Sequence, residues 1–355
     1  MSAPRLDSRR VFIGLAVVLS LILIGLVIYL LWFVPPDGAL NKQEREARAG
    51  LEPVLTIEGP GEGEKPMFSR PLGAAFGPDG RIYVTDSDND RICVFDSAGA
   101  FLFEFGGKGV LKPAPGIKPT WEAGLFNFPV GIDVDERGAV YVADLHNDQI
   151  QVFDADGTFL RVFPDPLQPL GKGSSGEGGT GLAVTDIAVT DNRVYAIDSF
   201  QIVVFDTAGT FLAQFGRPGA APGDLSYPNG IDVAPDGTLY VADSGNNRVQ
   251  ALTPVGVPVW ALGERVSELQ ADVDNAFGLP RGITMLDDGS LMVVDAFEFM
   301  LKHVSADGRM MEELGERGVE PAQFNFPNSV DDLGDLLVVA DKENDRVQVL
   351  RIVPE

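Results

Sequence analysis

The chain has 355 residues and one cysteine, and its 52 acidic against 27 basic side chains give a formal net charge of −25. A body this acidic repels a phosphate backbone, so we expect no nucleic-acid partner. The single cysteine, Cys93, excludes an intramolecular disulfide.

The first 50 residues separate into a tail, an apolar run and a linker. Residues 11–34 carry no charge and as a helix would span roughly 36 Å, enough to cross a bilayer. The run is longer than the apolar core of a cleavable signal peptide. We therefore expect a short cytoplasmic tail at 1–10, a transmembrane helix at 11–34 and a juxtamembrane linker at 35–50.

The basic residues that flank this run decide the expected orientation. Three lie on each side, and the pair Arg9 and Arg10 is directly at the membrane, which favours a cytoplasmic amino terminus. The stretch from Ser8 to Phe12 also resembles a twin-arginine export signal, and either alternative exports the body. The expected location is the cell membrane, in a single pass, with the body extracytoplasmic.

One phrase then returns six times. It reads PDGRIYV and DSDNDRICVF at 78–95, and PDGTLYVADSGNNRVQAL at 235–252. Self-similarity at this period indicates repeated units that bury their apolar faces only against one another. Each unit carries one anchor aspartate: Asp86, Asp144, Asp198, Asp243, Asp295 and Asp341.

Each unit contains four strand signals. In the second unit they are 131–134, 139–143, 149–153 and 158–163, separated by Gly- and Asp-containing turns. Alternating β-branched and aromatic residues between such turns favour antiparallel hairpins. Six four-stranded sheets predict an all-β, six-bladed β-propeller over residues 51–355.

The ring must also close. The sixth unit ends with its third strand near Val349, whereas residues 54–59 have the shape of a fourth strand. We expect this amino-terminal segment to complete the last blade, which removes both open sheet edges.

The repeated phrase resembles the NHL repeat of six-bladed propellers, over residues 51–355. The residues that carry the resemblance are Pro129-Val130-Gly131-Ile132, Tyr141-Val142-Ala143-Asp144 and Asn246-Asn247-Arg248-Val249-Gln250. The third unit departs most, with Thr185-Asp186 in place of x-Gly, and the fifth has Phe297-Glu298-Phe299 where Asn and Asp usually stand. The chain is similar to membrane-anchored bacterial members that serve as sensors, and this implies a binding role.

Strand order assigns the loops to two faces. The short turns share one face, and the second-to-third loops share the other face with the connectors between blades, including the insertions at 106–127 and 164–182. Long loops on a rigid scaffold commonly bind partners. We therefore expect a protein, peptide or cell-envelope ligand on the long-loop face, with mere spacers as the alternative.

Two groups of residues are candidates for contact with that partner. The first is the residue that precedes the glycine position of each first strand, at the mouth of the central channel: Leu72, Val130, Thr185, Asn229, Arg281 and Asn328. The second lies in the connectors and loops: Trp121, His146 and Phe297. Solvated rim residues, and plugs between blades in the case of Trp121, are the alternatives.

A third pattern concerns the axis. Asp133, Asp232 and Asp331 occupy one position in alternate blades, so closure of the ring would place three carboxylates around the channel. Hard divalent cations take oxygen ligands, and a cation here is one hypothesis. Carboxylates satisfied by backbone amides are the favoured alternative, and we expect no other cofactor.

Catalysis has little support in the sequence. Propeller lyases that use zinc need several histidines near the axis, and this chain has only His146 and His303. The sequence therefore favours a binding or scaffold propeller over an enzyme and leaves the question of catalysis open. A metal-dependent hydrolase or lyase that uses the axial carboxylates, and a structural subunit of an envelope complex, remain the alternatives.

Overall fold

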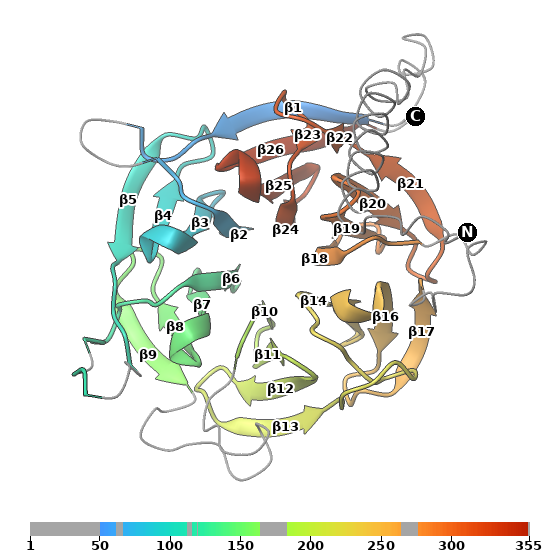
Figure 1. The fold of residues 1–355 in the computed structure, drawn as a ribbon, viewed down its shortest axis with the longest axis horizontal. Coiled ribbons are helices and arrows are strands. Elements are labelled where there is room, and N and C mark those ends of the chain that lie inside the picture. Colours follow the sequence, from blue (N-terminus) through green and yellow to red (C-terminus); the bar gives the residue numbers. More distant parts are fainter. Residues whose placement is uncertain are drawn as a thin grey trace, which may run out of the picture. The chain divides into compact units, whose positions relative to one another are not determined.

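The computed structural model describes residues 50–61, 67–111, 116–118, 120–163, 183–263 and 276–353. This part of the chain folds into six four-stranded antiparallel sheets arranged as a ring around a central axis (Figure 1). The predicted all-β, six-bladed propeller is confirmed. The predicted tail, the membrane span at 11–34 and the linker before Gly50 lie outside the described residues.

Within each of the first five blades the chain runs from the axis outward (Figure 1). Blade 1 comprises β2 (Pro71–Phe76), β3 (Ile82–Asp86), β4 (Arg91–Phe95) and β5 (Phe101–Gly106). Blade 2 comprises β6 (Pro129–Val134), β7 (Val140–Asp144), β8 (Gln149–Phe153) and β9 (Phe159–Phe163). Blade 3 comprises β10 (Asp186–Val189), β11 (Arg193–Asp198), β12 (Gln201–Asp206) and β13 (Phe211–Phe215).

The second half of the ring repeats this order. Blade 4 comprises β14 (Gly230–Val233), β15 (Leu239–Asp243), β16 (Arg248–Leu252) and β17 (Pro258–Leu262). Blade 5 comprises β18 (Pro280–Met285), β19 (Leu291–Asp295), β20 (Met300–Val304) and β21 (Met310–Leu314). Blade 6 comprises β24 (Pro327–Leu333), β25 (Leu336–Asp341), β26 (Arg346–Val353) and β1 (Gly50–Ile57).

Short elements fill the loops. The connector between blades 5 and 6 holds the parallel pair β22 (Glu316–Arg317) and β23 (Gln323–Phe324). Four single-turn 3₁₀ helices follow the second strands of blades 1, 2, 4 and 6: η1 (Ser87–Asn89), η2 (Leu145–Asn147), η3 (Ser244–Asn246) and η4 (Lys342–Asn344).

The clasp between the two ends of the ring is present as predicted. Strand β1 pairs antiparallel with β26, with Thr56 opposite Gln348 and Ile57 opposite Val347. Ile57 is buried in the core between blades 6 and 1, beside Val347 and Phe95. This pairing covers the outer edge of blade 6 with a strand from the other end of the propeller (Figure 1).

The middle strands of the blades are buried on both faces. All five residues of β7, from Val140 to Asp144, are buried, whereas the outer strand β5 alternates between half-buried and exposed residues. Each middle strand is covered by a blade on either side, so its alternate residues enter two different cores. This explains why the repeated phrase is nearly continuous in apolar residues at its centre.

The anchor aspartates hold each connector against its blade. In blade 4, Asp243 Oδ2 accepts hydrogen bonds from Asn246, Arg248 and Gln250 at 2.8–3.1 Å, and Oδ1 accepts the amide of Ser226 at 2.7 Å. Blade 6 repeats this arrangement around Asp341. A buried carboxylate is stable only with such partners, which accounts for the D-x-x-N-x-R-x-Q spacing in the sequence.

Aromatic residues of the connectors plug the seams between blades. Phe126 is fully buried and lies 5.5 Å from Phe153 and 6.5 Å from Phe105, measured between ring centroids. Phe68, Phe277 and Phe324 are buried three residues before the first strand of their own blades, as Phe126 is. Trp121, in the same connector as Phe126, is half-buried.

The predicted location requires correction. Over the residues that the structure describes, no helix combines the length and the apolar character needed to cross a bilayer. The prediction of a single-pass membrane protein with a cytoplasmic amino terminus and an extracytoplasmic propeller is contradicted by this finding, and we do not retain it.

Candidate functional site

Aromatic side chains gather around the axis on the long-loop face. They form a set that we call the aromatic crown: Phe128, His146, Phe200, Tyr227, Phe297, Phe299 and Phe326. Each comes either from a loop between second and third strands or from the last few residues before a first strand. Backbone hydrogen bonds tie these two kinds of segment together, for example His146 N to Asn127 O at 3.1 Å.

The crown residues contact one another in pairs and triplets. Phe128 stacks on His146 with 5.0 Å between ring centroids, and Phe200 lies 4.8 Å from Tyr227. Phe326 meets Phe299 and Phe297 at 5.0 and 6.0 Å. Two members are strongly exposed, since Tyr227 keeps 60% and Phe297 57% of its surface accessible.

Cations lie over several of these rings. Arg70 is 5.4 Å from the Phe128 ring centroid, Arg317 is 4.7 Å from that of Phe299, and Lys342 is 5.5 Å from that of Phe326. Aromatic residues and arginine are the types enriched where proteins bind one another. The long-loop face therefore has the composition of a binding surface.

The backbone of the crown is held in an unfavourable conformation. Phe128, Tyr227, Phe299 and Phe326 have φ between 46° and 65°, where bulky side chains are rare. Such strain costs about 1–3 kcal/mol for each residue and is concentrated at functional sites. A proline directly follows Phe128, Tyr227 and Phe326. The prolines after Phe128 and Phe326 begin a first strand, and the proline after Tyr227 lies two residues before one.

The six predicted mouth residues separate into two kinds. Val130 is 7% exposed and belongs to the core between blades 2 and 3, and Leu72 packs against the same core, so these two serve packing. The other four make polar contacts between neighbouring blades: Thr185, Asn229, Arg281 and Asn328. The bonds are Thr185 Oγ1 to Pro228 O (3.0 Å), Arg281 Nη2 to Asn229 Oδ1 (3.0 Å) and Asn328 Nδ2 to Leu72 O (2.7 Å).

The three predicted axial aspartates do come together. Asp133, Asp232 and Asp331 line a cavity of about 50 Å³ enclosed by the first strands of all six blades. Asp186, which stands at the glycine position of blade 3, is a fourth carboxylate in the lining. The sequence shows Thr185-Asp186 in place of x-Gly, and closure of the ring brings the Asp186 carboxylate to the axis.

Each axial carboxylate clamps its own blade to the next one. Asp133 accepts the amides of Val134 at 2.7 Å and of Val189, in blade 3, at 2.6 Å. Asp232 accepts the amide of Met285 in blade 5 at 2.6 Å, and Asp331 that of Phe76 in blade 1 at 2.7 Å. These hydrogen bonds match the alternative expected from the sequence, in which backbone amides satisfy the axial carboxylates.

Burial raises the pKa of these carboxyls, and their mutual repulsion adds to the effect. The pKa of Asp133 rises to about 8, that of Asp186 to about 7 and that of Asp232 to about 6, in each case chiefly through burial. The pKa of Asp331 is raised well above its ordinary value by burial and by the charge of Asp133. The cluster therefore holds protons near neutral pH.

The fit of a metal ion to these side chains is poor in the geometry observed. Among the described residues, no group of three or more His, Cys, Asp or Glu side chains is arranged to hold a metal ion. The oxygens of Asp133 already accept two amides. A cation bound by Asp133, Asp232 and Asp331 stays a prediction from the sequence.

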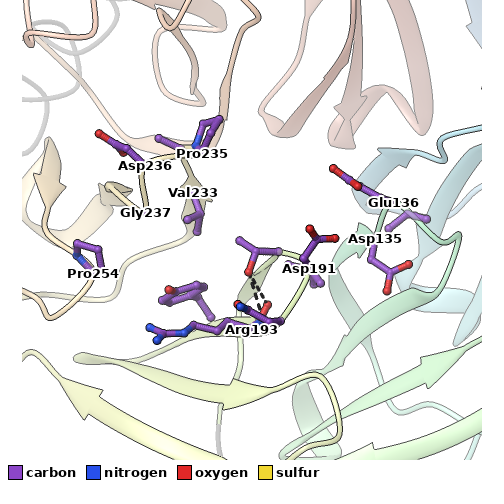
Figure 2. Close-up of a pocket in the computed structure, with 15 residues that line it drawn as sticks. Asp135, Glu136, Asp191, Arg193, Val233, Pro235, Asp236, Gly237 and Pro254 are labelled. Carbon is purple, nitrogen blue, oxygen red and sulfur yellow. Dashed lines mark hydrogen bonds between the residues drawn. The ribbon is translucent and has the colours of Figure 1, made fainter.

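The short-turn face carries a larger hollow that sequence reasoning missed. A cavity of about 660 Å³ opens beneath blades 2, 3 and 4, lined by their first hairpin turns. Figure 2 shows the carboxylates of Asp135, Glu136 and Asp191 on neighbouring turns, with Asp236 across the hollow. Arg193 and Tyr195 supply its polar groups from blade 3.

The turn that blade 3 contributes to this hollow is shorter than the equivalent turn of blade 2. Four residues, 190–193, separate Val189 from Val194 in blade 3, whereas five separate Val134 from Val140 in blade 2, and both pairs lie opposite each other in their ladders. The turn is closed by Thr190, whose Oγ1 accepts the amide of Arg193 at 3.2 Å (Figure 2). Counting turn residues across the aligned repeats would have revealed the missing residue.

A Ser–His–acid contact exists in blade 5, and it is enclosed. Ser290 Oγ lies 2.7 Å from His303 Nε2, and His303 Nδ1 lies 3.6 Å from Glu312. Ser290 is 6% and His303 9% exposed, and the Ser290 amide and hydroxyl both donate to Asp288. The group closes a turn, and no cavity opens onto it among those found in the described residues.

Solved structures share this architecture. The streptogramin B lyase structure superposes with a TM-score of 0.54 at 17% identity, over 85% of this chain and 97% of that one. A structural genomics protein of unknown function from Bacteroides thetaiotaomicron gives a TM-score of 0.59 at 18% identity, over 83% and 73%. At these identities the likeness shows the fold alone: the protein is a six-bladed β-propeller.

The repeats themselves match a known family model. The NHL repeat is matched at residues 68–95, 126–153 and 225–252, which cover the first three strands of blades 1, 2 and 4 and the few residues before them. The protein is therefore a propeller that carries NHL repeats.

Curated relatives resemble it over parts of the chain. They include Protein brain tumor of Drosophila melanogaster (26% identical over 36% of this chain) and the E3 ubiquitin-protein ligase TRIM32 of Homo sapiens (31% over 28%). A third is the probable peptidyl-alpha-hydroxyglycine alpha-amidating lyase pgal-1 of Caenorhabditis elegans (25% over 43%). The matches span 15%, 16% and 43% of the relatives' own lengths.

Proposed function

We propose that the propeller binds a protein or peptide partner through the aromatic crown on its long-loop face. The observation that carries the proposal is the group of aromatic residues around the mouth. Two of them have strongly exposed side chains, and four have a strained backbone. Tyr227 and Phe297 expose more than half of their surfaces, and such anchors supply most of the free energy of protein association.

Rigidity of the scaffold supports the same proposal. The crown residues sit at the ends of first strands and in loops fixed by the anchor aspartates. A surface held in place before binding loses little conformational entropy when a partner docks. Binding through the crown therefore needs no rearrangement of the blades.

The names of relatives agree with a proteinaceous partner. One relative is a ubiquitin-protein ligase and another a probable peptidyl lyase, and both names refer to protein or peptide substrates. The expectation of a cell-envelope ligand depends on an extracytoplasmic location. Because that location is not retained, the proposal does not include such a ligand.

Alanine substitution of the crown tests the proposal. Linear peptides would be selected on the immobilised full chain from a displayed library, and their affinities measured for the wild type, Phe297→Ala and Tyr227→Ala. We expect each substitution to weaken binding at least tenfold, because loss of an aromatic hot spot costs about 2 kcal/mol.

Val255 provides the matched control. It is an exposed apolar residue in the turn between β16 and β17, on the short-turn face. Val255→Ala is expected to leave affinity within about twofold of the wild type. Equal losses in all three variants, or losses in Val255→Ala alone, would place the binding surface elsewhere.

A second candidate is a lyase or hydrolase that uses a cation at the axial carboxylates. The name of the pgal-1 relative favours it, whereas the axial carboxylates, as the structure describes them, are not arranged to hold a metal ion. Metal analysis of the purified full chain, with thermal unfolding before and after chelation, separates the two candidates. A stoichiometric metal whose removal lowers the unfolding midpoint would favour the lyase.

A further inference from the structure

Arg281 is a half-buried cation that lacks a counter-ion in the part of the chain that the structure describes. Its Nη2 donates to Asn229 Oδ1 at 3.0 Å, but its Nε is buried and has no hydrogen-bond partner there. Burial lowers the pKa of Arg281, and no described carboxylate opposes that effect. A charged group in this state is unstable without a partner.

The cations that are buried among the described residues are all paired. Arg248 and Arg346 lie 2.8 and 2.7 Å from the carboxylates of Asp243 and Asp341. Lys302 is 3.4 Å from Asp295 and 2.8 Å from Glu298. Arg161 resembles Arg281, since its Nε also lacks a partner among the described residues and its Nη2 bonds to Tyr141 Oη at 3.3 Å. Arg281 differs from Arg161 in its position at the channel mouth, which suggests that its partner comes from outside.

A second unsatisfied group lies in the equivalent position of the next blade. Asn328 donates its Nδ2 to Leu72 O at 2.7 Å, and its Oδ1 is buried without a donor among the described residues. The mouth therefore offers donors at Arg281 and an acceptor at Asn328. A ligand that satisfies both must present an anionic acceptor together with an N–H.

The mouth is continuous with the aromatic crown. The side chain of Asn229 accepts from Arg281 through Oδ1. Its Nδ2 donates to Tyr227 O at 2.9 Å and to Ser244 Oγ at 3.0 Å. These bonds fix the orientation of Asn229 and, through it, one arm of the guanidinium. A ligand seated on Tyr227 is therefore within the same connected surface as Arg281.

We propose that Arg281 and Asn328 bind the carboxyl terminus of a peptide ligand, whose carboxylate pairs with the guanidinium while its last amide N–H donates to Asn328 Oδ1. Arginine binds a carboxylate through two parallel hydrogen bonds. One unpaired cation balances one negative charge, and the net charge of −25 opposes any polyanion. This inference rests on the proposed binding of a peptide at the crown and names its end group.

N-acetylglycine is the smallest probe that carries both features. We expect it to raise the thermal unfolding midpoint of the full chain and to bind measurably by calorimetry, and N-acetylglycinamide, which has no carboxylate, to do neither. Arg281→Gln should weaken N-acetylglycine binding by roughly 10- to 100-fold, the loss expected for a hydrogen bond to a charged group. Arg309→Gln, which alters an exposed arginine paired with Asp307, should bind as the wild type does.

Three results would overturn the inference. Tighter binding of inorganic phosphate than of N-acetylglycine would assign the mouth to a different anion. Equal binding by wild type and Arg281→Gln would place the probe elsewhere. No binding by the wild type, with a lower unfolding midpoint for Arg281→Gln, would mean that the chain itself supplies the counter-ion; residues 264–275 contain Glu264, Glu268, Asp272 and Asp274.

Failure of this inference and failure of the crown proposal are distinguishable. If Phe297→Ala weakens selected peptides while Arg281→Gln does not, the crown binds peptides and the end group is wrong. If N-acetylglycine binds at Arg281 while crown substitutions leave peptide affinity unchanged, the mouth is an anion site and the crown is not the docking surface.

Discussion

Buried charge is handled in three different ways within this one ring. The anchor aspartate Asp243 is neutralised by Arg248, so both groups stay charged. The axial carboxyl of Asp133 has no cation beside it, and burial raises its pKa to about 8, so it is protonated at neutral pH. Arg281 has no carboxylate partner within the described residues, and its Nε makes no hydrogen bond there. For this reason we assign its partner to a ligand.

The protonation of Asp133 predicts a pH dependence of stability. Its folded-state pKa of about 8 lies above the value near 3.9 of an unfolded chain. The folded state therefore binds more protons, and the free energy of unfolding falls as pH rises from about 4 to about 8. Asp133→Asn removes this contribution, so we expect a shallower decline, by on the order of 5 kcal/mol across that range.

Chemical denaturation at pH 5 and pH 8 measures the difference. The lost amide acceptor of Asp133→Asn adds a constant offset, so the slope with pH is the informative quantity. Asp236→Asn is the control, because the pKa of Asp236 is lowered by the amide of Thr238 and this carboxylate is already ionised above pH 5. Equal slopes for the wild type and Asp133→Asn would show that Asp133 is ionised in the folded protein.

At the scale of elements, closure of the ring depends on the strand that arrives from the amino-terminal side. Strand β1 contributes few buried side chains, and Ile57 is the one that enters the core between blades 6 and 1. Ile57→Ala is expected to lower the free energy of unfolding by about 2–4 kcal/mol, the usual result of truncating a buried isoleucine.

Val54 is the matched control for this prediction. It lies in the same strand, where the register with β26 shifts, and 46% of its surface is exposed. Val54→Ala should change stability by less than about 0.5 kcal/mol. Similar losses for the two variants in urea denaturation would mean that β1 does not clasp the ring through its buried face.

The repeat made the elements predictable from sequence. Turn residues and alternation located the strands, and a missing fourth strand after Val349 implied the pairing of β1 with β26, which the structure confirms. The short-turn cavity was not predicted, because its depth depends on how the turns of three neighbouring blades meet in the closed ring. The periodicity of the repeat locates the strands and carries no information about that depth.

The candidate site was only partly visible in the sequence, for a physical reason. The sequence points to His146 and Phe297 as partner residues, and both lie in the crown. It does not point to Tyr227 and Phe326, because these are ordinary loop residues until the ring brings them beside Phe200 and Phe299. Convergence of distant residues is a property of closure. The same holds for Asp186, which joins the axial cluster from a glycine position.

At the scale of the whole molecule, the two faces of the ring differ in chemistry. The long-loop face presents aromatic rings with cations above them, whereas the hollow of the short-turn face is lined by four carboxylates and one arginine. A partner with apolar side chains gains most on the first face, because burial of aromatic surface drives association. We therefore assign partner binding to the long-loop face of the propeller.

Site-specific photocrosslinking tests this assignment most directly. A photoreactive phenylalanine analogue would replace Phe297 in one full-length protein and Val255 in another, and each would be irradiated with the selected peptides. The account predicts a covalent peptide adduct at position 297 and none at position 255. Adducts at 255 in the absence of any at 297 would contradict it.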